Sequence, residues 1–141
     1  MHIVCPHCLA TNRVAPERLG ESPVCGRCRA PLAPAEPVAL DDASFERYVA
    51  GTEMPVVVDF WADWCGPCKA MAPAFAAAAR ERPGMRFVKV DSDAAAATAA
   101  SFGIRSIPTM VLLQRGRETA RVSGAMPASR LLAWIDENLA A

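Results

Sequence analysis

The 141-residue sequence predicts an α/β protein, a mixed sheet with helices on both faces and a small metal-stapled unit at the N-terminus. Strand-like and helix-like apolar segments alternate from Val38 to the C-terminus, which is typical of this class. Residues 1–30 instead hold four of the six cysteines and almost no long apolar run. All six cysteines occur in Cys-x-x-Cys pairs, a pattern that points to metal binding or redox chemistry.

The first thirty residues are too few to bury a stabilising core of their own, so they require a cross-link such as a bound metal ion or disulfides. Cys5/Cys8 and Cys25/Cys28 are separated by 16 residues, the spacing of a four-cysteine zinc site. One bound Zn²⁺ would supply the missing folding free energy. Two disulfides are the alternative, and a reducing compartment disfavours them. His7 lies inside the first pair and is expected to face solvent. We therefore predict a zinc ribbon.

A proline-rich stretch at residues 31–37 predicts a semi-rigid linker, which leaves residues 38–141 as the main domain. Asp41 or Asp42 is the expected cap of its first helix. The segment Pro55–Trp61 is apolar on both faces and is expected to be a central strand. The predicted strands are Val38–Leu40, Pro55–Trp61, Met85–Val90, Thr109–Gln114 and Glu118–Ser123, the last two joined by a hairpin turn at residues 115–117. The predicted helices run from Asp41 or Asp42 to about Ala50, from the third cysteine pair to about Arg82, from Asp93 to about Phe102, and from Pro127 onward, where Leu131, Ile135 and Leu139 form an apolar stripe.

Composition excludes several classes of function. Lys and Arg together number 15, as do Asp and Glu, so the net charge is zero and no strongly charged partner is implied. Residues 1–30 carry four Arg and two Glu, a net of +2, which is too weak to predict nucleic-acid binding. No apolar stretch reaches the roughly 18 residues of a membrane span, and no secretory signal opens the chain. A cytoplasmic monomer is expected.

The third cysteine pair lies between a buried strand and a helix. Cys65 would stand at the helix N-terminus, where free backbone N–H groups and the helix dipole favour the thiolate, the reactive form of cysteine. Cys68 follows one turn later and can resolve a mixed disulfide with Cys65. Gly66 permits the tight turn, and Pro67 fits the first helical turn because it has no N–H to lose. A third pair of metal ligands is the alternative, but the other two pairs already supply four ligands.

The segment Trp64–Lys69, with the sequence Trp-Cys-Gly-Pro-Cys-Lys, resembles the active site of the thioredoxin family. The resemblance extends over nearly all of residues 38–141. The segments that carry it are Val57–Ala62 before the cysteines, Pro73 within the long helix, Gly103–Thr109 as the family's proline loop, and Val122–Ala125. With the N-terminal ribbon, the chain resembles the zinc-ribbon thioredoxins of the bacterial thioredoxin 2 type.

The resemblance implies a thioredoxin fold and a protein-disulfide reductase. Its partners would be disulfide-containing target proteins and an NADPH-dependent thioredoxin reductase, with no tightly bound organic cofactor. Two other functions stay open. The ribbon could be a redox-sensing zinc switch or a partner-docking module, and the cysteine pair could act as a protein-disulfide oxidase or isomerase.

The resemblance also assigns roles around the cysteines. Asp59 stands in an apolar strand, so it should be buried with a raised pKa, and the resemblance implies that it exchanges protons with Cys68. Lys89 on the neighbouring strand would be its charge partner, the alternative being an ion pair that only stabilises the sheet. Pro108 is expected to be cis, with the backbone of Ile107 pairing with substrate as an added strand. The remaining predicted substrate-binding residues are Trp64, Gly66, Pro67, Gly124 and Ala125.

Overall fold

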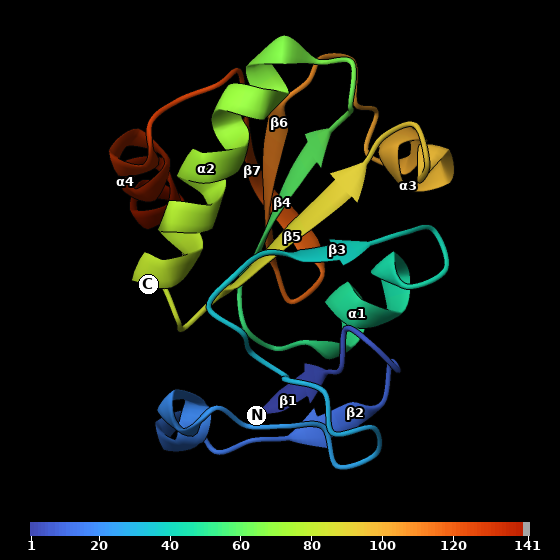
Figure 1. The fold of residues 1–141 in the computed structure, drawn as a ribbon, viewed down its shortest axis with the longest axis vertical. Coiled ribbons are helices and arrows are strands. Elements are labelled where there is room, and N and C mark those ends of the chain that lie inside the picture. The colour runs from blue at the N-terminus through green and yellow to red at the C-terminus, as the bar shows by residue number, and fades with distance from the viewer. Residues whose placement is uncertain (140–141) are drawn as a thin grey trace.

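The computed structural model describes residues 1–139 and contains a two-stranded and a five-stranded sheet (Figure 1). The N-terminal elements are β1 (His2–Val4), β2 (Thr11–Arg13) and the 3₁₀ helix η1 (Pro16–Glu21). The main domain consists of β3 (Val38–Leu40), α1 (Phe45–Gly51), β4 (Val56–Trp61), α2 (Gly66–Glu81), β5 (Arg86–Asp91), α3 (Ala96–Ser101), β6 (Thr109–Gln114), β7 (Arg117–Ser123) and α4 (Ala128–Asn138). The end of the predicted domain at Ala141 lies outside the described residues.

The five-stranded sheet is mixed, in the order β3-β5-β4-β6-β7. Strands β3, β5 and β4 are parallel, whereas β6 runs antiparallel to both β4 and β7. Strand β4 lies in the middle, and its residues from Val56 to Phe60 are all buried. The prediction of a central strand covered on both faces is therefore confirmed.

Helices cover both faces of this sheet, with α1 and α3 on one side and α2 and α4 on the other (Figure 1). Side chains along a strand alternate between the two faces. On β4, Val58 and Phe60 belong to the core cluster under α1 and α3, and Val57 belongs to the cluster under α2 and α4. Asp59 has the parity of Val57, so its carboxylate faces the layer that contains α2.

Two helices begin later than predicted, and one aspartate caps a different helix. Helix α1 begins at Phe45 because the Asp41 carboxylate accepts the N–H groups of Ala43 and Ser44, which forms a turn instead. Asp42 accepts from the backbone N–H and the hydroxyl of Thr98, at 2.8 and 2.7 Å, and so satisfies the first turn of α3. Helix α3 begins at Ala96 rather than at residue 93. Of the two caps predicted for α1, Asp41 stays beside that helix, whereas Asp42 acts across 55 residues of sequence.

The turn between β6 and β7 is shorter than predicted. Arg115 and Gly116 have φ angles of 53° and 76°, and β7 already begins at Arg117. Positive φ at both central residues is the geometry that matches the twist of a two-residue hairpin. Elsewhere the predicted turns and breaks are confirmed, including the end of α2 before Pro83 and the continuation of that helix through Pro73.

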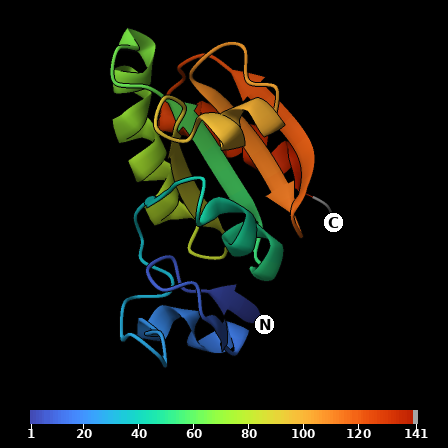
Figure 2. The same cartoon turned by 90° about the vertical axis from the view of Figure 1, so that its right-hand side faces the viewer.

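The N-terminal unit is docked on the main domain. The N–H of Glu53 donates to the carbonyl of His2 at 3.0 Å, and the N–H of Val4 donates to the Thr52 hydroxyl at 3.1 Å. Val4 is buried in the main core, and Met54 is buried in the core of the N-terminal unit. The two views show this unit at the end of the sheet where β4 begins, with the start of α2 at the opposite end (Figures 1 and 2).

The proline-rich stretch packs against both parts of the chain. Pro31 forms a bridge with Val24, and Leu32 is buried in the apolar cluster of the N-terminal unit. Arg86, which is buried at the start of β5, donates to the carbonyl of Pro34 at 2.9 Å. These contacts add to those of β1 and hold the small unit against the sheet.

Gly51 lies where α1 meets β1, and its replacement by alanine should weaken this docking. A Cβ at Gly51 would lie 2.6 Å from Cγ2 of Val4, which is fully buried and cannot easily move. We expect Gly51→Ala to lower the free energy of unfolding by about 1–3 kcal/mol, the usual cost of overpacking. Urea denaturation measures this change. Gly84→Ala is the matched control, because its Cβ would meet nothing within 4 Å; an equal effect of both substitutions would contradict the tight docking.

Candidate active site and metal centre

Cys65 and Cys68 form a disulfide at the start of α2. Cys65 is the N-cap residue, and its Sγ accepts a hydrogen bond from the N–H of Cys68 at 3.2 Å. Gly66 and Pro67 occupy the first helical positions, where a missing N–H costs nothing. Both sulfur-bearing residues are only 4% exposed, so a partner must approach closely to reach them.

Three segments far apart in the sequence meet around this disulfide. Trp64, Gly66 and Pro67 are exposed beside it, Trp64 to 72%. The Ile107–Pro108 peptide bond is cis, as predicted, and the Ile107 carbonyl oxygen lies 3.7 Å from the Cys65 sulfur. The third segment includes Gly124 and Ala125, both exposed, and the N–H of Gly124 donates to the carbonyl of Pro108 at 2.9 Å.

Trp64 is held by a residue that was not predicted. Its indole N–H donates to the carboxylate of Asp93 at 2.9 Å. Asp93 follows β5, and β5 is the parallel neighbour of β4, the strand that leads to Trp64. The carboxyl ends of adjacent parallel strands meet at one edge of a sheet, and this rule could have identified Asp93 from the sequence. The contact fixes the indole in place although it is exposed.

Asp59 is fully buried, as predicted, and neither carboxylate oxygen has a hydrogen-bond partner within residues 1–139. Burial raises its pKa to about 6, and the positive charge of Lys89 opposes that rise. Asp59 and Lys89 are register partners on β4 and β5. The side chain of Lys89 nevertheless makes no ion pair with Asp59. The Lys89 Nζ lies instead over the indole of Trp61, 4.9 Å from its ring centroid.

A cavity of about 100 Å³ adjoins the Cys68 side of the disulfide. Trp61, Cys68 and Lys89 contribute to its wall, together with Asp63 and Lys69, which are exposed. The cavity thus connects the neighbourhood of Cys68 with solvent along a path that has charged groups. A space of this size is large enough to hold water.

The four remaining cysteines form two nearly identical turns. In each turn the carbonyl of the first cysteine accepts an N–H from four residues later at 2.9 Å, and its own N–H donates to a carbonyl five residues later at 2.8 Å. The residue after each second cysteine has a positive φ, 64° at Leu9 and 69° at Arg29. Each turn therefore points two sulfur atoms to the same side, as a metal-binding knuckle requires.

The two knuckles bring all four sulfur atoms within 4.8 Å of one another. The Sγ atoms of Cys5 and Cys28 are 3.6 Å apart, as are those of Cys8 and Cys25. Tetrahedral zinc with Zn–S bonds of about 2.3 Å separates its sulfur ligands by about 3.8 Å, so the cluster fits one metal ion of this kind.

Hydrogen bonds support an anionic sulfur at Cys25, whereas burial and hydrogen bonds with the neighbouring thiols raise the pKa of Cys28 to about 12. The N–H of Cys28 and the side-chain amide of Asn12 lower the pKa of Cys25 to about 6. The N–H groups of His7 and Cys8 point to the Cys5 sulfur at 3.4 Å. His7 itself is exposed and is not part of the cluster, as predicted.

The mixed sheet, the cis-proline loop and a disulfide at a helix N-terminus define a thiol–disulfide oxidoreductase. Residues 36–137 match the family described as thioredoxin, and residues 4–30 match the zinc ribbon described as "Thioredoxin 2, N-terminal". The chain therefore belongs to the thioredoxin family, with Cys65 and Cys68 as its active-site pair and an N-terminal zinc-ribbon domain. Family membership implies disulfide-containing target proteins and a reductase as partners.

Known thioredoxins resemble the chain over most of its length. Thioredoxin C-3 of Corynebacterium nephridii is 45% identical over 139 residues, which cover 99% of this chain and 96% of that protein. The thioredoxin of Haemophilus influenzae is 41% identical over 106 residues, which cover 74% of this chain and 99% of that protein. The M-type chloroplast thioredoxin of Spinacia oleracea is 40% identical over 113 residues, or 79% of this chain and 62% of that protein. Within residues 1–139 no helix has the length and apolar character needed to cross a bilayer.

Proposed function

We propose that the chain reduces disulfides in other proteins and is itself reduced by an NADPH-dependent thioredoxin reductase. The observation that carries this proposal is the placement of a nearly buried Cys65–Cys68 disulfide between exposed Trp64 and the backbone of Ile107. The Gly-Pro dipeptide between the cysteines resembles the one found in the reductants of this superfamily rather than the dipeptides of its oxidases. The proposed division of the chain is a ribbon at 1–30, a linker at 31–37 and the catalytic domain at 38–141.

In the proposed reaction the reduced enzyme supplies two electrons. The Cys65 thiolate attacks one sulfur of the target disulfide, and the other target sulfur leaves as a thiolate that takes up a proton. The Cys68 thiolate then attacks the Cys65 sulfur, which forms the Cys65–Cys68 disulfide seen in the structure and releases the second target thiolate. The target gains two protons and two electrons, and the enzyme loses them.

Asp59 and Lys89 are proposed to control proton transfer to and from the sulfur of Cys68. A carboxyl group with a pKa of about 6 can hold or release a proton near neutral pH. It faces the layer that contains α2, and the small cavity beside Cys68, with Lys89 in its wall, offers room for water near the thiol. Lys89 contributes positive charge near the carboxylate without pairing with it.

Target binding is proposed to rest on the exposed surface around the disulfide. The Ile107 backbone would pair with an extended target segment as an added strand. Trp64 offers an exposed apolar ring beside Cys65. The other residues proposed for contact are Gly66, Pro67, Pro108, Gly124 and Ala125, of which only Pro108 is buried.

We propose that the four-cysteine cluster holds one Zn²⁺ per chain and that its role is structural. Bound zinc would crosslink the two knuckles and supply folding free energy to the ribbon. The shared burial of Val4 and Met54 supports a structural role, because ribbon and catalytic domain complete each other's cores. Four cysteines that form no disulfide fit a reducing compartment, so the proposed location is the cytoplasm.

Native mass spectrometry of the reduced protein tests the metal assignment. We expect a mass increase of one zinc ion and two thiols that react in the folded state. The double variant Cys65→Ser/Cys68→Ser should keep the zinc and lose both reactive thiols, whereas Cys5→Ser/Cys28→Ser should lose the zinc. A wild-type protein without metal, with disulfides in the ribbon, would refute the zinc site and favour an oxidising compartment.

The reductase assignment is tested by insulin reduction coupled to NADPH oxidation through a bacterial thioredoxin reductase. We expect turnover that depends on all three components, and a reduction potential close to that of a reducing cytosol. A potential near that of the disulfide isomerases, with no coupled turnover, would favour the oxidase or isomerase function instead.

A further inference from the structure

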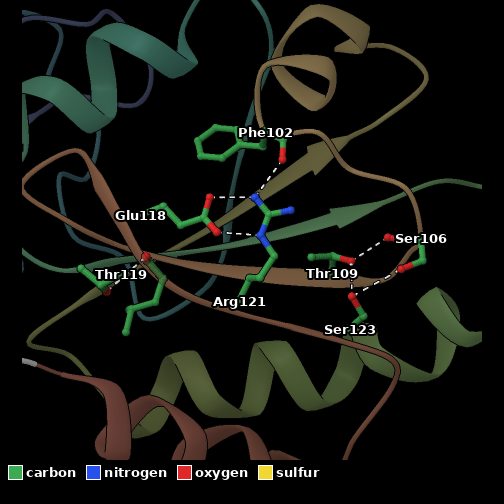
Figure 3. Close-up of polar contacts among 8 residues, drawn as sticks. Phe102, Ser106, Thr109, Glu118, Thr119, Arg121 and Ser123 are labelled. Atoms are coloured by element: carbon green, nitrogen blue, oxygen red, sulfur yellow. Dashed lines mark hydrogen bonds and ion pairs between the residues drawn. The ribbon is translucent and has the colours of Figure 1, made fainter.

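Three hydroxyl groups meet at the border between the cis-proline loop and the end of β7. The Thr109 hydroxyl lies 2.6 Å from the Ser106 carbonyl and 2.8 Å from the Ser123 hydroxyl. The Ser106 hydroxyl lies 3.4 Å from that of Ser123. Figure 3 shows the three side chains directed toward one another. Thr109 is buried, whereas Ser106 and Ser123 are exposed, so the network reaches the surface.

Each hydroxyl has one proton, and this fixes the direction of the hydrogen bonds. Thr109 donates its proton to the Ser106 carbonyl, so Ser123 must donate to Thr109. Ser106 in turn donates to Ser123. All three protons are used inside the network. The exposed Ser106 oxygen is therefore left with lone pairs and presents a hydrogen-bond acceptor to solvent.

These hydroxyls border the backbone proposed to bind targets. Ser106 immediately precedes Ile107, whose carbonyl oxygen is 3.7 Å from the Cys65 sulfur. Ser123 immediately precedes Gly124, whose N–H is bonded to the carbonyl of Pro108. A target side chain next to the attacked cysteine would therefore pass close to the Ser106 oxygen.

Strand β7 also holds the other end of the proline loop. Arg121 donates to the Phe102 carbonyl at 2.8 Å, and its guanidinium is paired with Glu118 through two contacts of 2.6 and 2.7 Å (Figure 3). The loop between α3 and β6 is thus attached to β7 before Gly103 and again at Thr109. Such bracing fixes the acceptor in advance, which lowers the entropy cost of binding.

We propose that Ser106, oriented by Ser123, forms a polar subsite that accepts a hydrogen bond from a neutral donor side chain of the target, of the asparagine or glutamine class, beside the attacked cysteine. Arg105 is exposed next to Ser106, and its charge disfavours a lysine or arginine donor. The subsite rests on the proposed function, because it selects among targets that the enzyme reduces.

The test uses disulfide peptides that differ at a single position. Each carries asparagine or leucine, which are similar in size, at one of the two positions flanking the attacked cysteine. At one of these positions we expect the wild-type kcat/KM to be about fivefold higher for the asparagine peptide than for the leucine peptide. This ratio corresponds to one net hydrogen bond, and the difference should lie mainly in KM. Ser106→Ala should abolish the preference and Ser123→Ala should reduce it. Ser106→Thr keeps the hydroxyl and should restore it.

The matched control is Ser129→Ala, which removes an exposed hydroxyl on α4 and should keep the wild-type preference. The redox potential should be the same in all variants. A preference that survives in Ser106→Ala, or a wild type that reduces both peptides equally well, would overturn the subsite. If Ser106→Ala reduced both peptides more slowly by the same factor, the hydroxyls would have a purely structural role, which would also overturn the subsite. Failure of the wild type on insulin and on every peptide would instead refute the proposed reductase function.

Discussion

Replacing Cys65 with serine is expected to lower coupled insulin reduction by at least about a thousandfold. A serine hydroxyl is not ionised near neutral pH, so the variant lacks the thiolate that attacks the target disulfide. The position at the N-terminus of α2 cannot compensate, because the helix dipole is worth only about 1 kcal/mol. NADPH consumption under saturating reductase measures the loss.

Cys68→Ser should fail in a different way. Cys65 can still attack, but the mixed disulfide with the target cannot be resolved from within the enzyme. The variant should therefore accumulate as a covalent complex with one target chain, visible by mass spectrometry and released by dithiothreitol. If Cys65→Ser formed this complex and Cys68→Ser did not, the roles of the two cysteines would have to be exchanged. Ser129→Ala, which is remote from both sulfur atoms in the sequence, should remain fully active.

Features that depend on neighbouring residues could be predicted from the sequence. The cysteine pairs, the apolar run of β4 and the Pro-Gly end of α2 each contain their cause within a few residues. The spacing of Cys5, Cys8, Cys25 and Cys28 gave the metal cluster for the same reason, since each pair chelates from one local turn. The cis bond at Pro108 came from the family resemblance, because base rates alone favour the trans form.

Features that depend on tertiary contacts were missed. Asp42 has the local pattern of a helix cap, yet the helix that it caps is α3, because Thr98 lies next to it only in the folded chain. The docking of the ribbon rests on Val4, Gly51 and Met54, none of which stands out in the sequence. The hydroxyl network joins Ser106 to Ser123 across 17 residues. That Ser106 presents an acceptor to solvent follows only from which hydroxyl donates to which in this network.

Asp59→Asn is expected to stabilise the protein at neutral pH and to slow its reaction. The pKa of Asp59 rises from 3.8 to about 6 on folding because the carboxylate is buried. Folding therefore favours the protonated form, and the stability that this group contributes is present at acid pH and is lost as the pH rises toward 6. At pH 8 the buried charge costs the wild type about 3 kcal/mol, which asparagine avoids.

The pH dependence separates this electrostatic effect from a change in packing. The stability gain of Asp59→Asn should grow from under about 1 kcal/mol at pH 4 to about 3 kcal/mol at pH 8, measured by urea denaturation of the oxidised protein. Any effect of pH on the ribbon is common to both proteins and cancels in the difference. Glu118→Gln is a control with the opposite pH dependence. The hydrogen bond from Arg121 lowers the pKa of Glu118, so the stability that Glu118 contributes to the protein is lost as the pH falls. A gain that is the same at all pH values would contradict a buried charge at Asp59.

The same substitution should reduce the rate of mixed-disulfide resolution, by about a hundredfold if Asp59 acts as the general base for Cys68. Rate and stability would then change in opposite directions at pH 8, which distinguishes a functional carboxylate from one that only packs in the sheet. Lys89→Met provides the complementary measurement. It removes the positive charge that opposes the pKa rise of Asp59, so it should raise that pKa further and shift the pH profile of the resolution step to higher pH. An unchanged pH profile in both variants would place the proton of Cys68 on another group.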